Sequence, residues 1–323
     1  MAKFSNDVEA ADALASDFQK LKAEIGKVII GQQDVVQLML TAIFCKGHAL
    51  LVGVPGLAKT LLVQTISGAL DLQFKRIQFT PDLMPSDIIG SETLDKDRNF
   101  QFVKGPVFAN IILADEINRT PPKTQAALLE AMQENAVTIA GVRHALPQPF
   151  FVLATQNPIE QEGTYPLPEA QLDRFMFNIY LDYPSYAEEI EIVRTTTDVL
   201  NKQVEKIISG EDILAYQKLV RQVPVTDNVL EFAVRLVQRT RPGGENKLAT
   251  EWLEWGAGPR ASQYLILGAK CHALLNGKYS PDIEDVQAVA IPVLRHRIVR
   301  NFKAEASGLS VNELIQKLIS GGN

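Results

Sequence analysis

A glycine-rich turn lies between an apolar run and a helical pattern in the first fifth of the chain. Residues 53–60 read Gly-Val-Pro-Gly-Leu-Ala-Lys-Thr and follow the apolar residues 48–52. Successive backbone N–H groups of such a turn converge on a phosphate, and the helix that follows adds partial positive charge. We expect Lys59 to reach the β- and γ-phosphates of a nucleotide and the Thr60 hydroxyl to ligate Mg²⁺. A Gly/Pro turn that happens to precede Lys-Thr is the alternative.

The residues of this phosphate loop are predicted to contact the nucleotide: Gly53, Val54, Pro55, Gly56, Leu57, Ala58, Lys59, Thr60 and Leu61. One of them departs from the pattern G-x-x-x-x-G-K-[ST], because Ala58 stands at the second glycine. Alanine forms helices well and has no difficulty at negative φ. We therefore expect Ala58 to be tolerated in the first helical turn.

Two adjacent carboxylates end a second apolar run. Residues 111–114 read Ile-Ile-Leu-Ala and are followed by Asp115 and Glu116. Such a run is typical of a strand buried in a parallel sheet, and these sheets bind ligands at the carboxyl ends of their strands. We expect Asp115 to hold Mg²⁺ beside Thr60 and Glu116 to polarise the attacking water as general base. A strand capped by solvated acids is the alternative, but both motifs in this order predict Mg²⁺-dependent hydrolysis of a nucleoside triphosphate.

Three more polar residues stand where they are candidates for chemistry at the γ-phosphate. Asn157 follows the apolar run 151–154 and is predicted to orient the attacking water or contact the γ-phosphate, with a turn-initiating role before Pro158 as the alternative. Arg174 precedes the last predicted strand and is a candidate arginine finger. Arg260 begins a helix in the second half of the chain and is a candidate for contacting the phosphates. Arginines are mostly solvated surface residues, so both need further context.

Composition limits the alternatives. The 323 residues suggest two domains, and 46% hydrophobic and 22% charged residues are ordinary for a globular protein. The net charge of −6 provides no basic field for nucleic acid. Two cysteines without a C-x-x-C pattern favour buried thiols in a reducing compartment, and His48 and His144 are too isolated for a metal site. Without a signal region or an 18-residue apolar stretch, we expect a cytoplasmic protein with no membrane insertion.

The pattern of elements changes near Pro184. Apolar runs at 48–52, 74–79, 110–114, 150–154 and 175–181 alternate with helical patterns. They predict a five-stranded, doubly wound parallel sheet with helices on both faces. Beyond Pro184 the strand signal stops, and helical periodicity marks 212–221, 228–238, 262–275 and 283–300. Ser280 is the predicted N-cap of the last helix, before Pro281. We expect an α/β nucleotide-binding domain over 1–184, with a lead-in helix, and a small all-α lid over 185–323.

The order of these motifs resembles that of the AAA+ P-loop ATPases, and the amino-acid sequence within the motifs resembles that of their MoxR family. The most specific stretch is 165–175, Tyr-Pro-Leu-Pro-Glu-Ala-Gln-Leu-Asp-Arg-Phe. The other matching segments are 53–60, 113–125, 154–158, 258–261 and 294–297. The likeness extends over about residues 25–300, so it includes both predicted domains.

The resemblance implies a role for each candidate. Asn157 becomes sensor 1, Arg174 the finger that acts on a neighbouring subunit and Arg260 sensor 2, while Ile30 and Gly31 contact adenine. It also implies ATP and Mg²⁺ as ligands and a homo-oligomeric ring of six subunits. MoxR-like proteins resemble chaperones whose partners carry a von Willebrand A domain. Because the chain lacks a D-x-S-x-S pattern, that partner or client must be a separate protein.

A nucleic-acid motor or loader is the alternative function, since AAA+ relatives with similar insertions move on DNA. The acidic net charge and the absence of a basic tail disfavour it. The insertions are residues 86–106, which include a polar turn at 95–99, and a candidate hairpin over 137–146. In related proteins such hairpins engage substrates or partners. Inert surface decoration is the other interpretation.

Overall fold

The computed structural model describes residues 4, 6–94, 96–159, 163–197, 204–244 and 246–321. They form two compact units, each built from separate stretches of the chain. The sheet unit comprises Gln19–Leu167 and Ile179–Leu214. The helical unit comprises Met1–Phe18, Pro168–Asn178 and Ala215–Asn323. The domain boundary at residue 184 stays a prediction.

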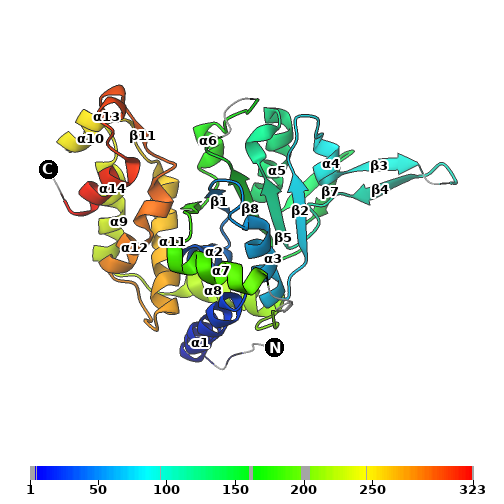
Figure 1. The fold of residues 1–323 in the computed structure, drawn as a ribbon, viewed down its shortest axis with the longest axis horizontal. Helices are drawn as coiled ribbons and strands as arrows, with labels where there is room; N and C mark the ends of the chain where they lie inside the picture. Colours follow the sequence, from blue (N-terminus) through cyan, green and yellow to red (C-terminus); the bar gives the residue numbers. More distant parts are fainter. Residues whose placement is uncertain are drawn as a thin grey trace. The chain divides into compact units, whose positions relative to one another are not determined.

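A five-stranded parallel sheet has the order β2-β5-β8-β1-β9 (Figure 1). Its strands are β1 (Ala49–Val52), β2 (Phe74–Gln78), β5 (Ile111–Asp115), β8 (Phe151–Gln156) and β9 (Phe177–Tyr180). All five predicted strands are confirmed. In β5 the residues Ile111 to Ala114 are fully buried, as expected for a strand covered on both faces. The pairs Val52↔Gln156 and Gln78↔Asp115 place the carboxyl ends of the strands at one edge of the sheet.

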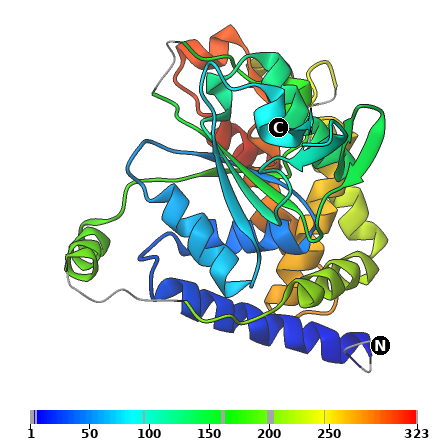
Figure 2. The ribbon, with the colours of Figure 1, turned by 90° about the vertical axis from the view of Figure 1, so that its right-hand side faces the viewer.

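Helices connect and flank these strands within the sheet unit. They are α2 (Gln33–Phe44), α3 (Lys59–Ala69), α4 (Pro85–Ile89), α5 (Pro122–Glu134), α7 (Tyr186–Thr196) and the short 3₁₀ helix η1 (Ile117–Arg119). Helix α7 begins with a reciprocal capping box between Ser185 and Glu188. In Figure 2 it stands at the margin of the sheet unit, on the left of the view, and none of its residues is fully buried.

Both predicted insertions contain β-hairpins. One pairs β3 (Gly90–Leu94) with β4 (Phe100–Lys104) and projects outward in Figure 1, and the other pairs β6 (Ala136–Ile139) with β7 (Val142–Ala145). Asp95, in the predicted polar turn, lies outside the described residues. The ring of Phe102 stacks on His144 with 4.2 Å between centroids, so the two hairpins contact each other.

The helical unit is built mainly around two long helices, α11 (Pro259–Leu275) and α12 (Ile283–Leu294). Gly268 permits their close approach, since a Cβ there would lie 3.1 Å from Val289. The other elements of this half are α6 (Glu169–Leu172), α9 (Asp227–Arg239), α10 (Lys247–Trp252), α13 (Phe302–Ala306) and α14 (Val311–Ile319). Helices α1 (Asp7–Gly26), which confirms the predicted lead-in helix, and α8 (Gly210–Gln222) contribute residues to both units.

Two details of the helical half differ from the sequence-based expectation. The last predicted helix ends at Leu294, and Val299–Arg300 instead forms β11, antiparallel to β10 (Leu253–Trp255). The N-cap of α12 is Asp282 rather than Ser280, because the Asp285 carboxylate accepts the Asp282 backbone N–H at 2.8 Å and completes a capping box. Short strands of two or three residues have too little alternation to be seen in a sequence.

The burial of both cysteines and the structural role of His48 agree with the sequence-based expectation. Within the described residues, no helix has both the length and the apolar character needed to cross a bilayer. Cys45 and Cys271 are buried free thiols. His48 is a structural histidine: its Nε2 lies 3.2 Å from the Met132 carbonyl oxygen and its Nδ1 accepts the Val152 N–H at 3.0 Å.

Candidate active site

The phosphate loop connects the end of β1 to the start of α3. Two of its glycines are required by geometry. A Cβ on Gly53 would lie 2.8 Å from the Leu181 side chain, and Gly56 has φ of +88°, in the region where side chains are strained. The predicted order of strand, tight turn and helix is therefore present at residues 49–69.

Ala58 is the N-cap of α3 and has φ of +51° and ψ of 29°. The expectation that this alanine takes up negative φ is therefore wrong. The residue lies just before the first helical residue, Lys59, where the loop turns through a left-handed conformation that glycine adopts more readily. The surrounding loop overrides the intrinsic preference of alanine, and the backbone is strained beside the predicted phosphate position.

The Lys59 side chain folds back over the loop. Its ammonium group donates a hydrogen bond to the Gly53 carbonyl oxygen. Partial burial lowers the pKa of Lys59, while the charges of Asp115 and Glu116 act in the opposite direction. Lys59 and the two predicted acidic residues thus share one electrostatic environment.

Both oxygens of the Asp115 carboxylate already have donors. Oδ1 accepts the Thr155 hydroxyl at 2.6 Å. Oδ2 accepts the Arg76 guanidinium through Nε at 3.0 Å and Nη2 at 2.6 Å. Thr155 lies on β8 and Arg76 on β2, the two strands that flank β5, so the sheet itself positions this acid.

Glu116 follows β5 in a left-handed conformation with φ of +57°. Its backbone N–H donates to the Thr155 hydroxyl oxygen at 2.8 Å. Its Oε2 accepts Gln78 Nε2 at 3.0 Å and Arg119 Nη1 at 3.1 Å. A non-glycine residue at positive φ is uncommon and is often found at functional sites, where neighbouring interactions hold it in place.

Asn157 directly follows β8 and is 6% exposed. Its Oδ1 accepts the Ile159 N–H at 3.1 Å, which is the local turn that the sequence offered as the alternative to a catalytic role. Because β8 lies between β5 and β1 in the sheet, the residue follows a strand adjacent to both motifs. A role as sensor stays a prediction.

A cavity of about 140 Å³ adjoins the phosphate loop within the sheet unit. Its walls include Ile29 and Ile30 before α2, Gly56, Leu57, Ala58 and Leu61 of the loop and α3, and Ile192, Thr195 and Thr196 of α7. Gly31 (φ of +69°) packs against the start of α7, since a Cβ there would lie 2.5 Å from Glu188. The structure therefore brings the predicted Ile30–Gly31 segment to the phosphate loop.

Arg174 and Arg260 belong to the helical unit. Arg260 Nη1 pairs with Asp173 Oδ2 at 2.9 Å, and Arg297 Nε pairs with Asp173 Oδ1 at 2.7 Å. Arg174 directly follows Asp173 in the chain, and its carbonyl oxygen accepts the Tyr264 hydroxyl at 3.3 Å. One carboxylate thus connects the segment of the predicted finger to the helix of the predicted sensor 2.

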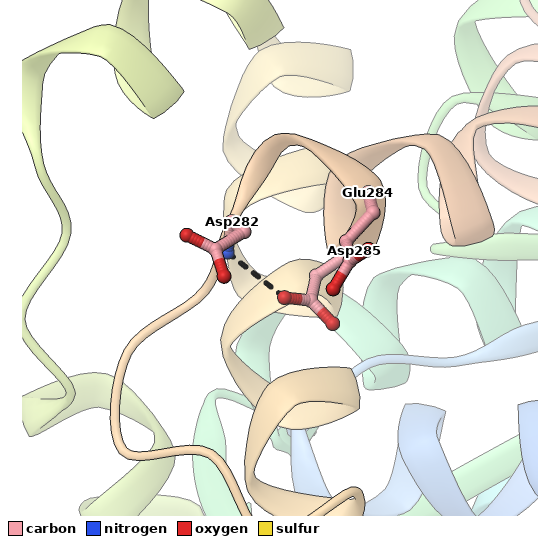
Figure 3. Close-up of side chains that lie close together, drawn as sticks. All are labelled: Asp282, Glu284 and Asp285. Atoms are coloured by element: carbon pink, nitrogen blue, oxygen red, sulfur yellow. Dashed lines mark hydrogen bonds between the residues drawn. The ribbon is translucent and has the colours of Figure 1, made fainter.

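A separate group of carboxylates in the helical unit lacks the character of a metal centre. Figure 3 shows Asp282, Glu284 and Asp285 at the start of α12. Asp285 accepts the Asp282 backbone N–H, the Lys278 ammonium at 3.2 Å and His272 Nδ1 at 2.7 Å. These interactions already compensate the buried charge and cap the helix.

Comparisons with known proteins agree with this geometry. Residues 48–177 match the ATPase family associated with various cellular activities (AAA), and residues 245–318 match the AAA lid domain. Chaperone MoxR1 of Mycobacterium tuberculosis is 44% identical over 96% of this chain and 83% of its own length. Protein MoxR of Methylorubrum extorquens is 30% identical over 91% of this chain and 92% of its own length. A solved structure from Cytophaga hutchinsonii superposes with a TM-score of 0.91 at 43% identity, covering 98% of this chain and 97% of that one.

The chain belongs to the MoxR family of AAA+ ATPases. It is therefore an ATPase with an AAA+ fold and an AAA lid, as the sequence predicted. The site residues of this MoxR-family member fit a Mg²⁺–nucleotide ligand, since Thr60 and Asp115 offer the hard oxygen donors that Mg²⁺ prefers. The cavity beside the loop, with several aliphatic walls, suits the flat face of a base.

Several residues of the site were missed by sequence reasoning. They are Arg76 and Gln78 on β2, Thr155 on β8, and Ile192, Thr195 and Thr196 on α7. The polar residues of β2 and β8 reach the acids only because these strands flank β5 in the folded sheet. The sequence offers one signal: Arg76 and Gln78 are two residues apart on a short strand, so their polar side chains lie on the same face of the sheet.

Proposed function

We propose that this MoxR-family chain assembles into a homohexameric ring, in which Mg²⁺-dependent ATP hydrolysis drives remodelling or maturation of another protein. The observation that carries the proposal is the distribution of cations. Beside the acid pair, Arg76 and Arg119 are already paired with Asp115 and Glu116. Of Arg76, Arg119 and Lys59, this leaves Lys59 of the phosphate loop to neutralise phosphate charge. The negative charge that develops on the γ-phosphate during hydrolysis therefore calls for a further cation.

Within one chain, the proposed roles follow from position. The phosphate-loop amides and Lys59 hold the phosphates, and Glu116 accepts the proton of the attacking water as general base. Asn157 orients that water from the neighbouring strand. Thr60 and Asp115 would hold Mg²⁺, which when bound neutralises phosphate charge. For the Asp115 carboxylate to take part, its pairing with Arg76 must loosen.

Arg174 is the proposed finger acting on a neighbouring subunit, and Arg260 the proposed sensor that contacts the phosphates. Both are carried by the helical unit and are connected through Asp173. A finger of this kind contributes roughly 10³–10⁵ in rate. A head-to-tail contact uses two different surfaces and closes into a ring when the rotation between subunits allows it. With Arg174 supplied by a neighbour, each active site would be complete only in the assembly.

The proposed partner is a protein, either a client or a separate chain with a von Willebrand A domain. The relative Chaperone MoxR1 supports this class by its name. The paired hairpins offer a contact surface, since Leu94 and Phe100 at the tip of one of them are 59% and 75% exposed. The buried free thiols Cys45 and Cys271 agree with a cytoplasmic location.

The test combines two inactive variants. Arg174→Ala and Glu116→Gln should each bind ATP and fail to hydrolyse it. The turnover of the wild type per subunit should rise with protein concentration. It should disappear when EDTA removes Mg²⁺. In mixed hexamers about a quarter of the interfaces would pair an intact Glu116 with an intact Arg174, so activity should partly return. Arg235→Ala, which removes an exposed arginine from α9, is the matched control and should leave turnover unchanged.

Turnover independent of concentration would contradict the ring. Absence of rescue, in rings shown by mass spectrometry to be mixed, would contradict the assignment of Arg174. For Arg260→Ala, unchanged turnover would assign the residue to packing on Asp173. Strong stimulation by DNA, with no effect of partner proteins, would favour the nucleic-acid alternative.

A further inference from the structure

Arg174, the proposed finger, lies in a segment of the helical unit whose backbone is bound by side chains. The carbonyl oxygens of residues 173–176 each accept a hydrogen bond from a side chain of that unit. Carbonyl oxygens in folded proteins are bonded mostly by backbone N–H groups, so four successive acceptors of side-chain donors form a specific arrangement. The donors belong to Tyr264 on α11 and to Arg297, which follows the end of α12.

Arg297 supplies most of these donors. Its Nη2 donates to the carbonyl oxygens of Asp173 and Phe175 at 2.9 and 2.7 Å, and its Nη1 donates to that of Met176 at 3.3 Å. Its Nε donates to Asp173 Oδ1 at 2.7 Å, and Nη1 also donates to the Val293 carbonyl oxygen. All five N–H groups of the guanidinium thus have an acceptor, and three of the acceptors are backbone carbonyls that flank the finger on both sides.

This guanidinium lies in the interior of the helical unit. The Arg297 side chain is 2% exposed, and its charge is compensated by the Asp173 carboxylate. Hydrogen bonds from a charged donor are strong, and breaking one in the interior leaves a polar group without a partner. The segment that Arg297 holds therefore keeps one geometry relative to the end of α12.

Two neighbouring side chains complete the arrangement, and we call Tyr264, His296 and Arg297 together the Arg297 clamp. The Tyr264 hydroxyl donates to the Arg174 carbonyl oxygen at 3.3 Å, and its ring centroid lies 5.1 Å from Arg297 Cζ. His296 Nε2 donates to the Phe175 carbonyl oxygen at 3.0 Å. Burial lowers the pKa of His296 well below 6.5, so the imidazole is neutral. The clamp thus fixes the backbone that carries the finger.

A finger has to meet the γ-phosphate of a neighbouring subunit with precision, because a displacement of about 1 Å can cost on the order of 100-fold in rate. We propose that Arg297 is the positioning residue of the Arg174 finger, which it holds through the carbonyl oxygens of residues 173, 175 and 176. This role rests on the proposed function of Arg174 in a ring. A substitution in the clamp would then slow hydrolysis at the neighbour's site and leave the nucleotide site of its own subunit intact.

Arg297→Lys is the first test. Lysine keeps a positive charge opposite Asp173, but its three donors at a single point cannot hold all five acceptors. Turnover should fall about 10-fold to 100-fold, while the affinity for ATP, measured with a fluorescent nucleotide, should stay within about twofold. Arg300→Lys is the matched control, because Arg300 likewise donates to a backbone carbonyl oxygen of the helical unit, that of Leu309 at 2.9 Å. It should leave turnover unchanged.

Tyr264→Phe is the milder variant and serves where the lysine variant does not fold. It keeps the ring beside Arg297 and removes the donor to the Arg174 carbonyl oxygen, so turnover should fall about threefold to tenfold. Tyr279→Phe, which removes an exposed hydroxyl that donates to Asp12, is its control. Whichever variant serves, turnover at the wild-type rate overturns the proposal.

Mixed rings separate the positioning of a finger from a role in the subunit's own site. Because Arg297→Lys keeps its own Glu116, rings mixed with Glu116→Gln should regain activity above that of either variant alone. Rings mixed with Arg174→Ala should not, since both variants then lack a well-placed finger. Equal recovery in the two mixtures, or the reverse pattern, would give Arg297 a role in its own subunit's site and overturn the proposal. The same mixtures apply to Tyr264→Phe.

The mixture of Arg174→Ala with Glu116→Gln is the reference for these rings. If it regains activity and the mixture of Arg297→Lys with Glu116→Gln does not, the positioning role of Arg297 fails alone and the finger stands. If the reference mixture stays inactive, the finger assignment fails, and the positioning role fails with it.

Discussion

The hydroxyl oxygen of Thr155 lies 2.6 Å from Asp115 Oδ1 and donates its proton to that carboxylate. The same oxygen accepts the backbone N–H of Glu116 at 2.8 Å. A fully buried residue of β8 therefore holds the proposed metal ligand and the proposed general base in one arrangement. Neither acid is positioned by β5 alone.

Thr155→Val should impair both stability and hydrolysis. Valine keeps the shape of threonine but leaves the Glu116 N–H without its acceptor and removes one donor to Asp115. Loss of such buried hydrogen bonds costs about 1–3 kcal/mol of unfolding free energy. We expect a lower urea midpoint and reduced ATPase turnover. Thr155→Ser keeps the hydroxyl and should stay near wild type in turnover; equal losses in both variants would mean that packing, not the hydrogen bonds, matters.

Arg76→Gln tests whether the arginine competes with Mg²⁺ for Asp115. The Arg76 side chain is 46% exposed, and pairs of this kind contribute at most about 1 kcal/mol. Without it, Asp115 Oδ2 is free to ligate the metal, so the affinity for Mg²⁺–ADP should rise up to about fivefold in calorimetry. Lys75→Gln removes the charge of the preceding residue of β2 and is the control. Weaker affinity in Arg76→Gln would show that the arginine instead orients Asp115 for the metal.

Glu116→Gln and Lys59→Ala should separate catalysis from binding. The amide keeps the size and hydrogen bonding of Glu116 but cannot accept the proton, so turnover should fall by about 10²–10⁴ while ATP still binds. Lys59→Ala removes a charge from the phosphates and should weaken ATP binding itself. Fluorescent-nucleotide titration and phosphate release measure the two effects. An equal loss of nucleotide affinity in both variants would make Glu116 a structural residue.

Much of the fold and of this site was predictable from the sequence, because the signals are local. The buried strand before Asp115 and the turn before Lys59 are each contained in fewer than a dozen residues. Arg76 and Thr155 could not be assigned, since the strand order β2-β5-β8 arises from tertiary packing. The α7 wall of the base cavity was missed for the same reason. Ala58 shows the reverse failure, in which a sound local preference loses to the loop around it.

Ala58→Gly tests that strain. A left-handed conformation costs an L-residue about 1–2 kcal/mol, which glycine would recover. The greater freedom of glycine in the unfolded chain lowers the stability by about 0.4–1 kcal/mol and offsets part of that gain. We expect the unfolding free energy, measured in urea, to stay equal or rise by up to roughly 1.6 kcal/mol. Gly56→Ala, at φ of +88°, should be destabilising. A clear loss of stability in Ala58→Gly would mean that the alanine methyl group makes contacts worth more than the strain.

His48 should make the protein less stable in mild acid. Burial disfavours the charged imidazolium and lowers the pKa of His48 to about 4, against 6.5 in its ordinary state. The stability is therefore complete above about pH 6.5 and falls as the pH drops toward 4, where the unfolded chain binds a proton that the folded chain excludes. The loss at pH 4 amounts to roughly 3 kcal/mol.

Urea unfolding of wild type and His48→Gln at several pH values measures this loss of stability. Glutamine offers a donor and an acceptor but does not titrate, so the variant should be less stable at neutral pH and lose less on acidification. Since buried His296 contributes a dependence of the same sign in both proteins, the difference between the two curves isolates His48. Parallel curves would contradict the assignment.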